Sequence, residues 1–229
     1  MKKTLTIVIT VLVFFVCVIV LGSVINRKMH SVASGDALTL LKKGNARFAA
    51  TRLRHPSRSA KRRKETARYG QNPYAIVLTC ADSRVPVEIL FDAGIGDIFV
   101  VENAGNIAQD DIVAGSIEYA AKHLNSPLLV ILGHTECGAV QAALSDVPAA
   151  GNIRVIQKII EPAAAKAKAT SPHLEGSELL NAAIENNVLQ SKTDLLARSK
   201  IIKDMHDKGS LKIVTGVYDI KTGTIDWDE

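Results

Sequence analysis

Two short stretches, CADSR at residues 80–84 and HTEC at residues 134–137, hold the side chains best suited to chemistry. Thiolates and imidazoles are preferred ligands of Zn²⁺, and Cys80, His134 and Cys137 supply two thiols and one imidazole. A set of three protein ligands is typical of catalytic zinc, because the fourth position stays open for water or substrate. The residue types therefore favour a catalytic metal site.

The number and spacing of the cysteines bear on whether they bind a metal, form a disulfide or act as a redox pair. The chain has three cysteines, and Cys17 lies in an apolar N-terminal run, which leaves Cys80 and Cys137. An exported protein could join these two in a disulfide. A thioredoxin-like redox pair is disfavoured, because it needs Cys-x-x-Cys and the residue three positions before Cys137 is His134. The remaining histidines have no comparable neighbours: His30, His55, His123, His173 and His206.

Asp82 and Arg84 follow Cys80 at alternate positions. If the chain stays extended there, both side chains face the same side, and Arg84 can pair with Asp82 in a bidentate manner. A carboxylate fixed beside a metal can accept a hydrogen bond from a metal-bound hydroxide. A purely structural Asp–Arg pair is the alternative.

Strands alternate with helices along the body of the chain. Continuous apolar runs predict buried parallel strands at residues 74–79, 97–101 and 127–133. A further strand and an antiparallel hairpin return are predicted at residues 211–220 and 224–227. Helical patterns occupy residues 37–50, 110–124, 138–145, 152–169 and 177–207. This order predicts an α/β fold with a central, mainly parallel sheet flanked by helices.

Such sheets bind ligands outside the carboxyl ends of their strands. Cys80 directly follows one predicted strand, and the stretch GHTECGA directly follows another. The two halves of the candidate site are therefore expected at the same edge of the sheet, although 57 residues separate the cysteines.

The N-terminus carries a run of 22 residues without a charge, residues 4–25, preceded by Lys2 and Lys3. A bilayer core takes about 20 apolar residues, and a basic start before a long apolar run is also typical of a secretory signal. Cleavage could follow Ala33 or lie near Gly22–Ser23. We expect an exported, for example periplasmic, protein or one anchored to the inner membrane by residues 4–25.

These patterns divide the chain into three parts. Residues 1–33 are predicted to be a signal peptide or membrane anchor, residues 34–70 an N-terminal helical arm, and residues 71–229 a catalytic α/β domain. Membrane contact is expected only through the N-terminal part.

The net charge of +5 comes largely from the N-terminus, since residues 1–33 hold four basic residues and no acidic one. The rest of the chain holds 24 of the 28 basic residues and all 23 acidic ones, so its net charge is close to zero. No nucleic-acid partner is therefore expected. A local basic run at residues 52–68 contains no aromatic residue for base stacking. We interpret it as a solvated helix face or arm; contact with anionic lipid is the alternative.

Four motifs of this sequence resemble those of a known family: CADSRVP (80–86), GDIFVVENAGN (96–106), GSIEYAAKHL (115–124) and GHTECGAV (133–140). GNARF (44–48) and GVYDIKTGTI (216–225) add weaker support. With these motifs the sequence resembles the β-class carbonic anhydrases over about residues 36–226.

The resemblance implies that Cys80, His134 and Cys137 bind one Zn²⁺ per subunit and that Asp82 and Arg84 form a catalytic dyad. Zinc lowers the pKa of its water from about 15.7 to about 7, and the resulting hydroxide attacks CO₂ to give bicarbonate. In some relatives the dyad aspartate becomes a fourth ligand, so Asp82 would bind the metal only in a closed, inactive state.

The resemblance also implies a homodimer or a higher homo-oligomer, with residues 36–69 wrapping the partner. Relatives commonly carry Arg at the position of Glu102, and in a subset that Arg helps to bind inhibitory bicarbonate, so such regulation is not expected here. Three alternatives stay open at this point. They are a zinc hydrolase of carbonyl sulfide or carbon disulfide, a non-catalytic zinc-binding protein of the same fold, and a disulfide-bonded exported module.

Overall fold

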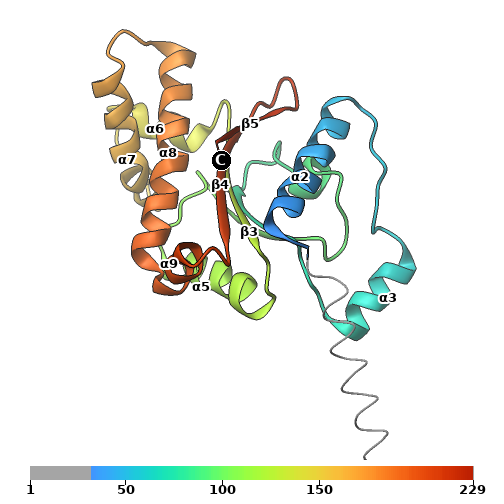
Figure 1. Ribbon diagram of the computed structural model, residues 1–229. Coiled ribbons are helices and arrows are strands. Elements are labelled where there is room, and N and C mark those ends of the chain that lie inside the picture. The colour runs from blue at the N-terminus through green and yellow to red at the C-terminus, as the bar shows by residue number, and fades with distance from the viewer. Residues whose placement is uncertain (1–31, 229) are drawn as a thin grey trace, which may run out of the picture. The chain divides into compact units, whose positions relative to one another are not determined.

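A single five-stranded sheet, with strand order β2-β1-β3-β4-β5, forms the centre of the fold (Figure 1). The computed structural model describes residues 32–228. The apolar run at residues 4–25, with the predicted signal or anchor, lies outside these residues. Within residues 32–228 no helix combines the length and the apolar character needed to cross a bilayer.

The strands are β1 (Ala75–Cys80), β2 (Ile98–Asn103), β3 (Leu128–His134), β4 (Lys212–Tyr218) and β5 (Ile225–Asp228). Strands β2, β1, β3 and β4 run parallel, and β5 returns antiparallel to β4. Every residue of β1 and β3 is buried, which explains their continuous apolar sequence. The predicted mainly parallel sheet with its antiparallel return is confirmed.

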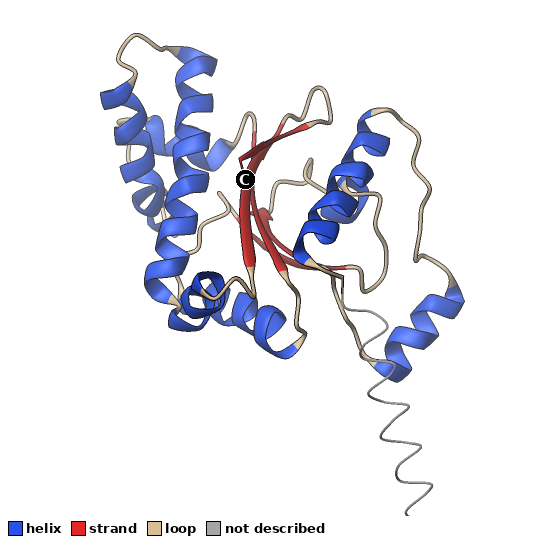
Figure 2. Ribbon diagram, viewed as in Figure 1, coloured by secondary structure: helices blue, strands red, loops and turns tan. Residues whose placement is uncertain are grey.

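Helices cover both faces of the sheet, as Figure 2 shows in blue. Their bounds are α2 (Ser34–Ala49), α3 (Ala60–Tyr69), α4 (Val87–Leu90), α5 (Asp111–Glu118), α6 (Gly138–Leu144), α7 (Ile153–Thr170), α8 (Gly176–Arg198) and α9 (Lys200–Asp207). The helix predicted at 110–124 is α5 followed by a π-helical turn at Tyr119–His123. Helix α8 packs on β3 and β4, and α2 lies on the opposite side of the sheet (Figure 1).

The helical pattern predicted at residues 177–207 forms two helices rather than one, because the chain breaks between α8 and α9. Ser199 is extended there, with φ −106° and ψ 103°, and its Oγ accepts a hydrogen bond from the Ile202 N–H at 3.0 Å. The same hydroxyl donates to the Glu118 carboxylate at 2.5 Å. Ser199 is thus the N-cap of α9, held in place by a residue of α5.

Helix α2 packs on its own chain at Gly44 and Asn45. A Cβ on Gly44 would lie 1.9 Å from the Phe91 carbonyl oxygen, so only glycine permits this approach. The Asn45 amide donates to the carbonyl of Gly223 at 2.8 Å. The boundary between a helical arm at 34–70 and a catalytic domain at 71–229 stays a prediction.

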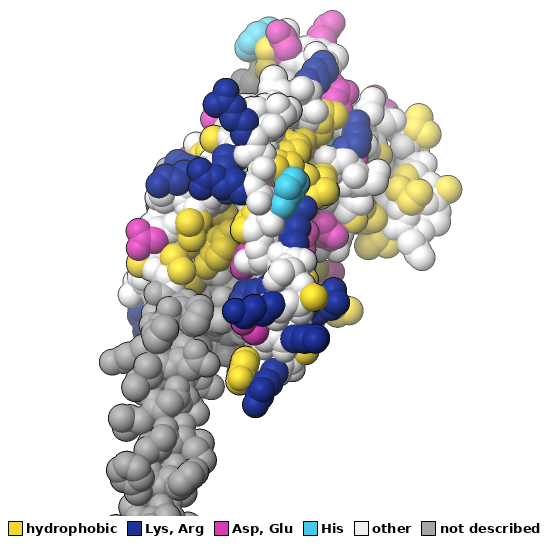
Figure 3. Space-filling model, turned by 90° about the vertical axis from the view of Figure 1, so that its right-hand side faces the viewer, with side chains coloured by type: hydrophobic (Ala, Val, Ile, Leu, Met, Phe, Trp, Pro, Cys, Tyr) yellow, Lys and Arg dark blue, Asp and Glu magenta, His cyan; other side chains and the backbone are white. Residues whose placement is uncertain are grey.

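The basic run at residues 52–68 spans a loop and α3, a helix that contributes no buried residue. Asp92 fixes the loop, because its carboxylate accepts from the Arg47 Nε at 2.6 Å and from the N–H groups of Arg54 and His55 at 2.9 Å each. Figure 3 shows Lys and Arg side chains spread over this face of the molecule. The interpretation as a solvated face agrees with this exposure.

The buried core of the described chain lies between Ala37 and Ile225. It includes both sheet faces, the sheet-facing side of α8 and the inner residues of α2. Because this core is complete within the unit Ala33–Glu229, we expect that unit to fold by itself.

Candidate metal centre

The carboxyl ends of β1 and β3 carry the two halves of the predicted site. These strands are parallel neighbours, with Thr79 of β1 beside Leu132 of β3. Cys80 and His134 therefore leave the sheet at the same edge. Cys137 follows at the start of α6, where it is the N-cap residue. One ligand atom from each of these three residues lies within 4.8 Å of the other two, and all three side chains are buried.

His134 is oriented by its own strand end. Its Nδ1 lies 2.8 Å from the Thr135 carbonyl, which can only accept, so Nδ1 carries the hydrogen and Nε2 presents a lone pair. Nε2 has no hydrogen-bond partner among the described residues, although His134 is fully buried. A buried nitrogen without a partner is rare in folded proteins, and a metal ion would satisfy it.

The two cysteines are free thiols in the structure, so the disulfide alternative has no support from it. A hydrogen bond from Cys137 lowers the pKa of the Cys80 thiol to about 4, against the effect of burial, and the hydrogen bond from the Gly105 N–H lowers it further. The hydrogen bond to Cys80, together with burial, raises the pKa of Cys137. Two thiols and an imidazole lone pair in one buried cluster fit the donor set of Zn²⁺.

Asp82 and Arg84 form the expected bidentate pair, with Nε to Oδ1 at 2.9 Å and Nη2 to Oδ2 at 2.7 Å. The expected extended backbone is wrong. The chain turns, because the Val85 N–H donates to the Asp82 carbonyl and the Arg84 N–H donates to Asp82 Oδ1, both at 2.9 Å. The hydrogen bonds from Arg84 hold the pKa of Asp82 well below its usual range. A short turn, rather than strand alternation, brings the pair together.

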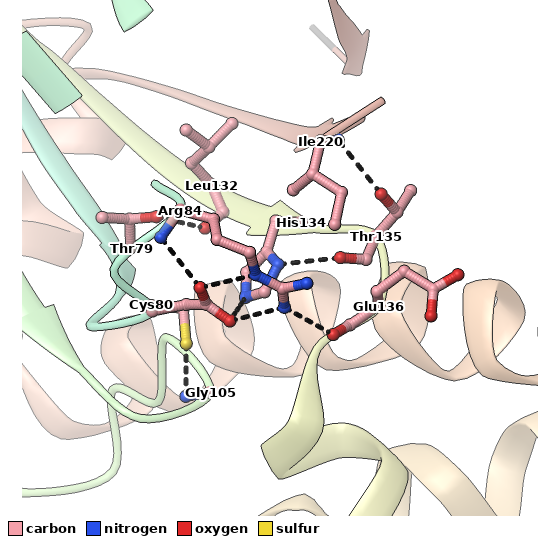
Figure 4. A network of polar contacts seen from close by, with 10 residues as sticks. Thr79, Cys80, Arg84, Gly105, Leu132, His134, Thr135, Glu136 and Ile220 are labelled. Carbon is pink, nitrogen blue, oxygen red and sulfur yellow. Dashed lines mark hydrogen bonds and ion pairs between the residues drawn. The ribbon is translucent and has the colours of Figure 1, made fainter. Parts of the chain in front are cut away.

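The pair faces the metal ligands. Oδ2 of Asp82 lies 3.8 Å from Nε2 of His134. Nη2 of Arg84 also donates to the carbonyl of Glu136 at 3.1 Å, so the guanidinium links the CADSR and HTEC stretches (Figure 4). In this structure Asp82 is paired with Arg84; its role as a fourth ligand in a closed state stays a prediction.

Sequence reasoning missed two contributions to the site. The carbonyl of Glu136 is available to Arg84 because Glu136 adopts a left-handed φ of 58°, while its side chain is exposed as expected. The N–H of Gly105 donates to the Cys80 sulfur at 3.3 Å. The glycine in ENAGN was the available signal, since it has a φ of 80°.

Glu102 lies on β2, beside Thr79 of β1, and is exposed. Partial burial and, secondly, the neighbouring Glu88 raise the pKa of its carboxyl group. The position near Cys80 therefore carries acidic rather than basic character.

Fold and donor set together define an α/β protein with a thiolate–imidazole site at the carboxyl edge of a parallel sheet. A family model described as carbonic anhydrase matches residues 75–225. The chain belongs to this carbonic anhydrase family, and the hydration of CO₂ is its expected activity.

Individual proteins support this assignment. Carbonic anhydrase 2 of Mycobacterium tuberculosis is 41% identical over 187 residues, which cover 80% of this chain and 87% of that protein. The solved β-carbonic anhydrase CcaA is 25% identical with a TM-score of 0.67, covering 74% of this chain and 86% of that one. A tetrameric β-carbonic anhydrase from Sordaria macrospora, 24% identical, shares the fold with a TM-score of 0.68 over 73% of this chain and 86% of that one.

Proposed function

We propose that this protein is a zinc-dependent β-class carbonic anhydrase that interconverts CO₂ and bicarbonate. Cys80, His134 and Cys137 would hold one Zn²⁺ per subunit. The observation that carries this proposal is the meeting of three buried donor groups within 4.8 Å, one of them an imidazole nitrogen without a hydrogen-bond partner among the described residues. Zinc, when bound, supplies Lewis acidity and makes hydroxide available from water near pH 7.

Asp82 and Arg84 are the proposed catalytic pair. The Asp82 carboxylate accepts a hydrogen bond from the attacking oxygen nucleophile and so orients it toward the carbon of CO₂. Arg84 keeps that carboxylate ionised and fixes its direction through two hydrogen bonds. Arg84 also donates to the Glu136 carbonyl, which ties the pair to the HTEC stretch.

The surroundings of the cysteines suit an uncharged substrate. Ile107 and Val140 belong to the same buried apolar cluster as Cys80 and Cys137. CO₂ carries no charge and loses little hydration free energy on entering such surroundings. Bicarbonate is an anion, so it gains hydration free energy on leaving them. Apolar residues beside the metal ligands therefore favour the uncharged substrate over its anionic product.

The decisive experiment measures zinc content and stopped-flow CO₂ hydration on the same sample of residues 33–229. We expect one zinc per subunit together with hydration activity. His134→Ala should lose both, and His173→Ala, which changes an exposed histidine far along the chain, should lose neither. Stoichiometric zinc without hydration activity would favour the non-catalytic alternative, and a zinc-free protein with a Cys80–Cys137 disulfide would exclude the metal site.

We further propose a homodimer or higher homo-oligomer. Strand β2 is an edge of the sheet, which leaves backbone groups for pairing. Ile112 and Tyr119, large apolar residues on the segment after β2, are 82% and 49% exposed. Sedimentation equilibrium of residues 33–229 should give at least a dimer mass; a monomer at micromolar concentration would exclude this assembly.

For the N-terminus we propose export by a cleaved signal or anchoring to the inner membrane through residues 4–25. Support comes from the uncharged run of 22 residues after Lys2 and Lys3. Mass spectrometry of the mature chain separates the two, since a start after Ala33 or near Gly22 indicates cleavage and an intact Met1 indicates an anchor. Recovery of an intact chain in the soluble cytoplasmic fraction would contradict both.

A further inference from the structure

The loop after β2 is built to bring one backbone N–H to the Cys80 sulfur. Asn103 closes the loop, because its Oδ1 accepts from the Ile107 N–H and its Nδ2 donates to the Ile107 carbonyl, both at 2.8 Å. Between them, Gly105 and Asn106 adopt left-handed φ values of 80° and 46°. This tight turn leaves the Gly105 N–H 3.3 Å from Cys80 Sγ, as Figure 4 shows.

A distant helix holds the other side of the same glycine. Nδ2 of Asn187, on α8, donates to the Gly105 carbonyl at 2.8 Å across 82 residues of sequence. Asn187 is only 1% exposed. Residues Ala183 and Ile184, on the turn just before it, belong to the apolar cluster around the two cysteines. Burying an amide among apolar neighbours costs free energy unless the amide is hydrogen-bonded, and Asn187 meets this need by donating to the loop at Gly105.

We propose that Asn187 is a positioning residue of the metal centre, which holds Gly105 so that its N–H points at the Cys80 sulfur. This inference rests on the proposed function, because it assigns Cys80 as a zinc ligand. Hydrogen bonds to a ligand atom fix its direction and set its electron donation to the metal. Asn187 does not touch the donor atoms; it acts through the backbone of Gly105.

Gln190 provides a matched control on the same helix. It lies three residues after Asn187, is partly buried, and donates from Nε2 to the Ile159 carbonyl at 2.7 Å. That bond ties α8 to α7 and not to the loop. Gln190→Ala should therefore cost a similar hydrogen bond without affecting Gly105.

The test compares Asn187→Ala, Asn187→Leu and Gln190→Ala in residues 33–229. The leucine variant keeps much of the side-chain volume without a donor, in case the alanine variant folds poorly. Zinc dissociation constants from chelator competition should rise about tenfold or more for both Asn187 variants and stay near the wild-type value for Gln190→Ala. In the Co²⁺-loaded protein, the thiolate-to-cobalt charge-transfer band should move to longer wavelength only in the Asn187 variants, because the sulfur loses a hydrogen bond.

Hydrogen exchange in the zinc-free protein separates this inference from the proposed function. The Gly105 amide should exchange about tenfold faster in the Asn187 variants than in Gln190→Ala. Unchanged zinc affinity, charge-transfer band and Gly105 exchange in Asn187 variants of a zinc-binding protein would overturn the proposal. A wild-type protein that binds no zinc would contradict the proposed function instead, and unchanged Gly105 exchange would then reject the role of Asn187 as well.

Discussion

Gly105 offers a prediction whose magnitude follows from two separate features of the structure. Its φ of 80° costs an L-residue about 1–2 kcal/mol. A Cβ at this position would also lie 2.6 Å from Ile160 Cδ1 and 3.2 Å from Ala139 Cβ. Forcing an extra carbon into a packed core typically costs about 1–3 kcal/mol. Together these costs come to about 2–5 kcal/mol. The stiffer unfolded chain offsets about 0.4–1 kcal/mol of this, so Gly105→Ala should lower the free energy of unfolding by about 1–4.6 kcal/mol.

A second substitution separates the two contributions. Ile160→Val deletes the Cδ1 atom that the new Cβ would meet, and alone it should cost about 0.5–1.5 kcal/mol. In the double variant the steric conflict is largely gone, so its total cost should be smaller than the sum of the single costs by about 1–2 kcal/mol. The cost that remains beyond Ile160→Val alone is the backbone strain.

Urea unfolding of the zinc-free protein, at one fixed protein concentration, measures these free energies without ligand linkage. Costs that add to within about 0.5 kcal/mol would refute the steric explanation. A double variant as stable as Ile160→Val would refute the backbone strain.

Three further predictions concern the dyad, the basic loop and the break between α8 and α9. Asp82→Asn keeps the shape of the side chain but removes the negative charge. The rate of CO₂ hydration in stopped-flow should fall by about 100-fold or more, while the zinc content stays at one per subunit. Unchanged turnover would remove the dyad from the mechanism. Burial alone raises the pKa of Asp92, but Arg47 and two backbone N–H groups outweigh it and hold that pKa below the ordinary value of about 3.9. The stabilisation is thus present above that value and is lost as the pH falls through the lower folded pKa. Asp92→Asn should therefore reduce the fall of the urea unfolding midpoint at acid pH. A midpoint that depends on pH as in the wild type would contradict this. Ser199→Ala removes the cap that accepts from the Ile202 N–H and should lower the free energy of unfolding by about 1 kcal/mol, with no change expected in zinc content.

The strands and the meeting of the donor groups could be predicted because both depend on local patterns. Strands β1 and β3 are continuous apolar runs, and their burial on every residue is what such runs indicate. Once the strands are parallel neighbours, Cys80 and His134 must share an edge. Cys137 follows within three residues of His134, so chain length alone keeps it close.

The remaining features depend on contacts between distant residues. The helical pattern at 177–207 continues through Ser199, and the break is fixed partly by Glu118, 81 residues away. Helix α3 contributes no buried residue and so leaves no apolar period to detect. The turn that pairs Asp82 with Arg84 gives the same side-chain contact as an extended strand would, so the right pair was expected for the wrong backbone reason.

One turn of helix α8 contacts both β3, just before His134, and the loop after β2 that donates a hydrogen bond to Cys80. A Cβ on Gly133, the residue before His134, would lie 2.6 Å from Val188 Cγ2 and 3.3 Å from Ile184 Cγ2, so glycine is what lets α8 approach β3 there. Asn187, in the same turn, donates a hydrogen bond to the carbonyl of Gly105, whose N–H donates to Cys80. Because rigid packing transmits small displacements, a shift of this turn would alter the separation of the imidazole and the thiolate. The pairing of β1 with β3 brings the donor groups to one edge, and α8, far from both strands in sequence, supports the residue before His134 and the loop beside Cys80.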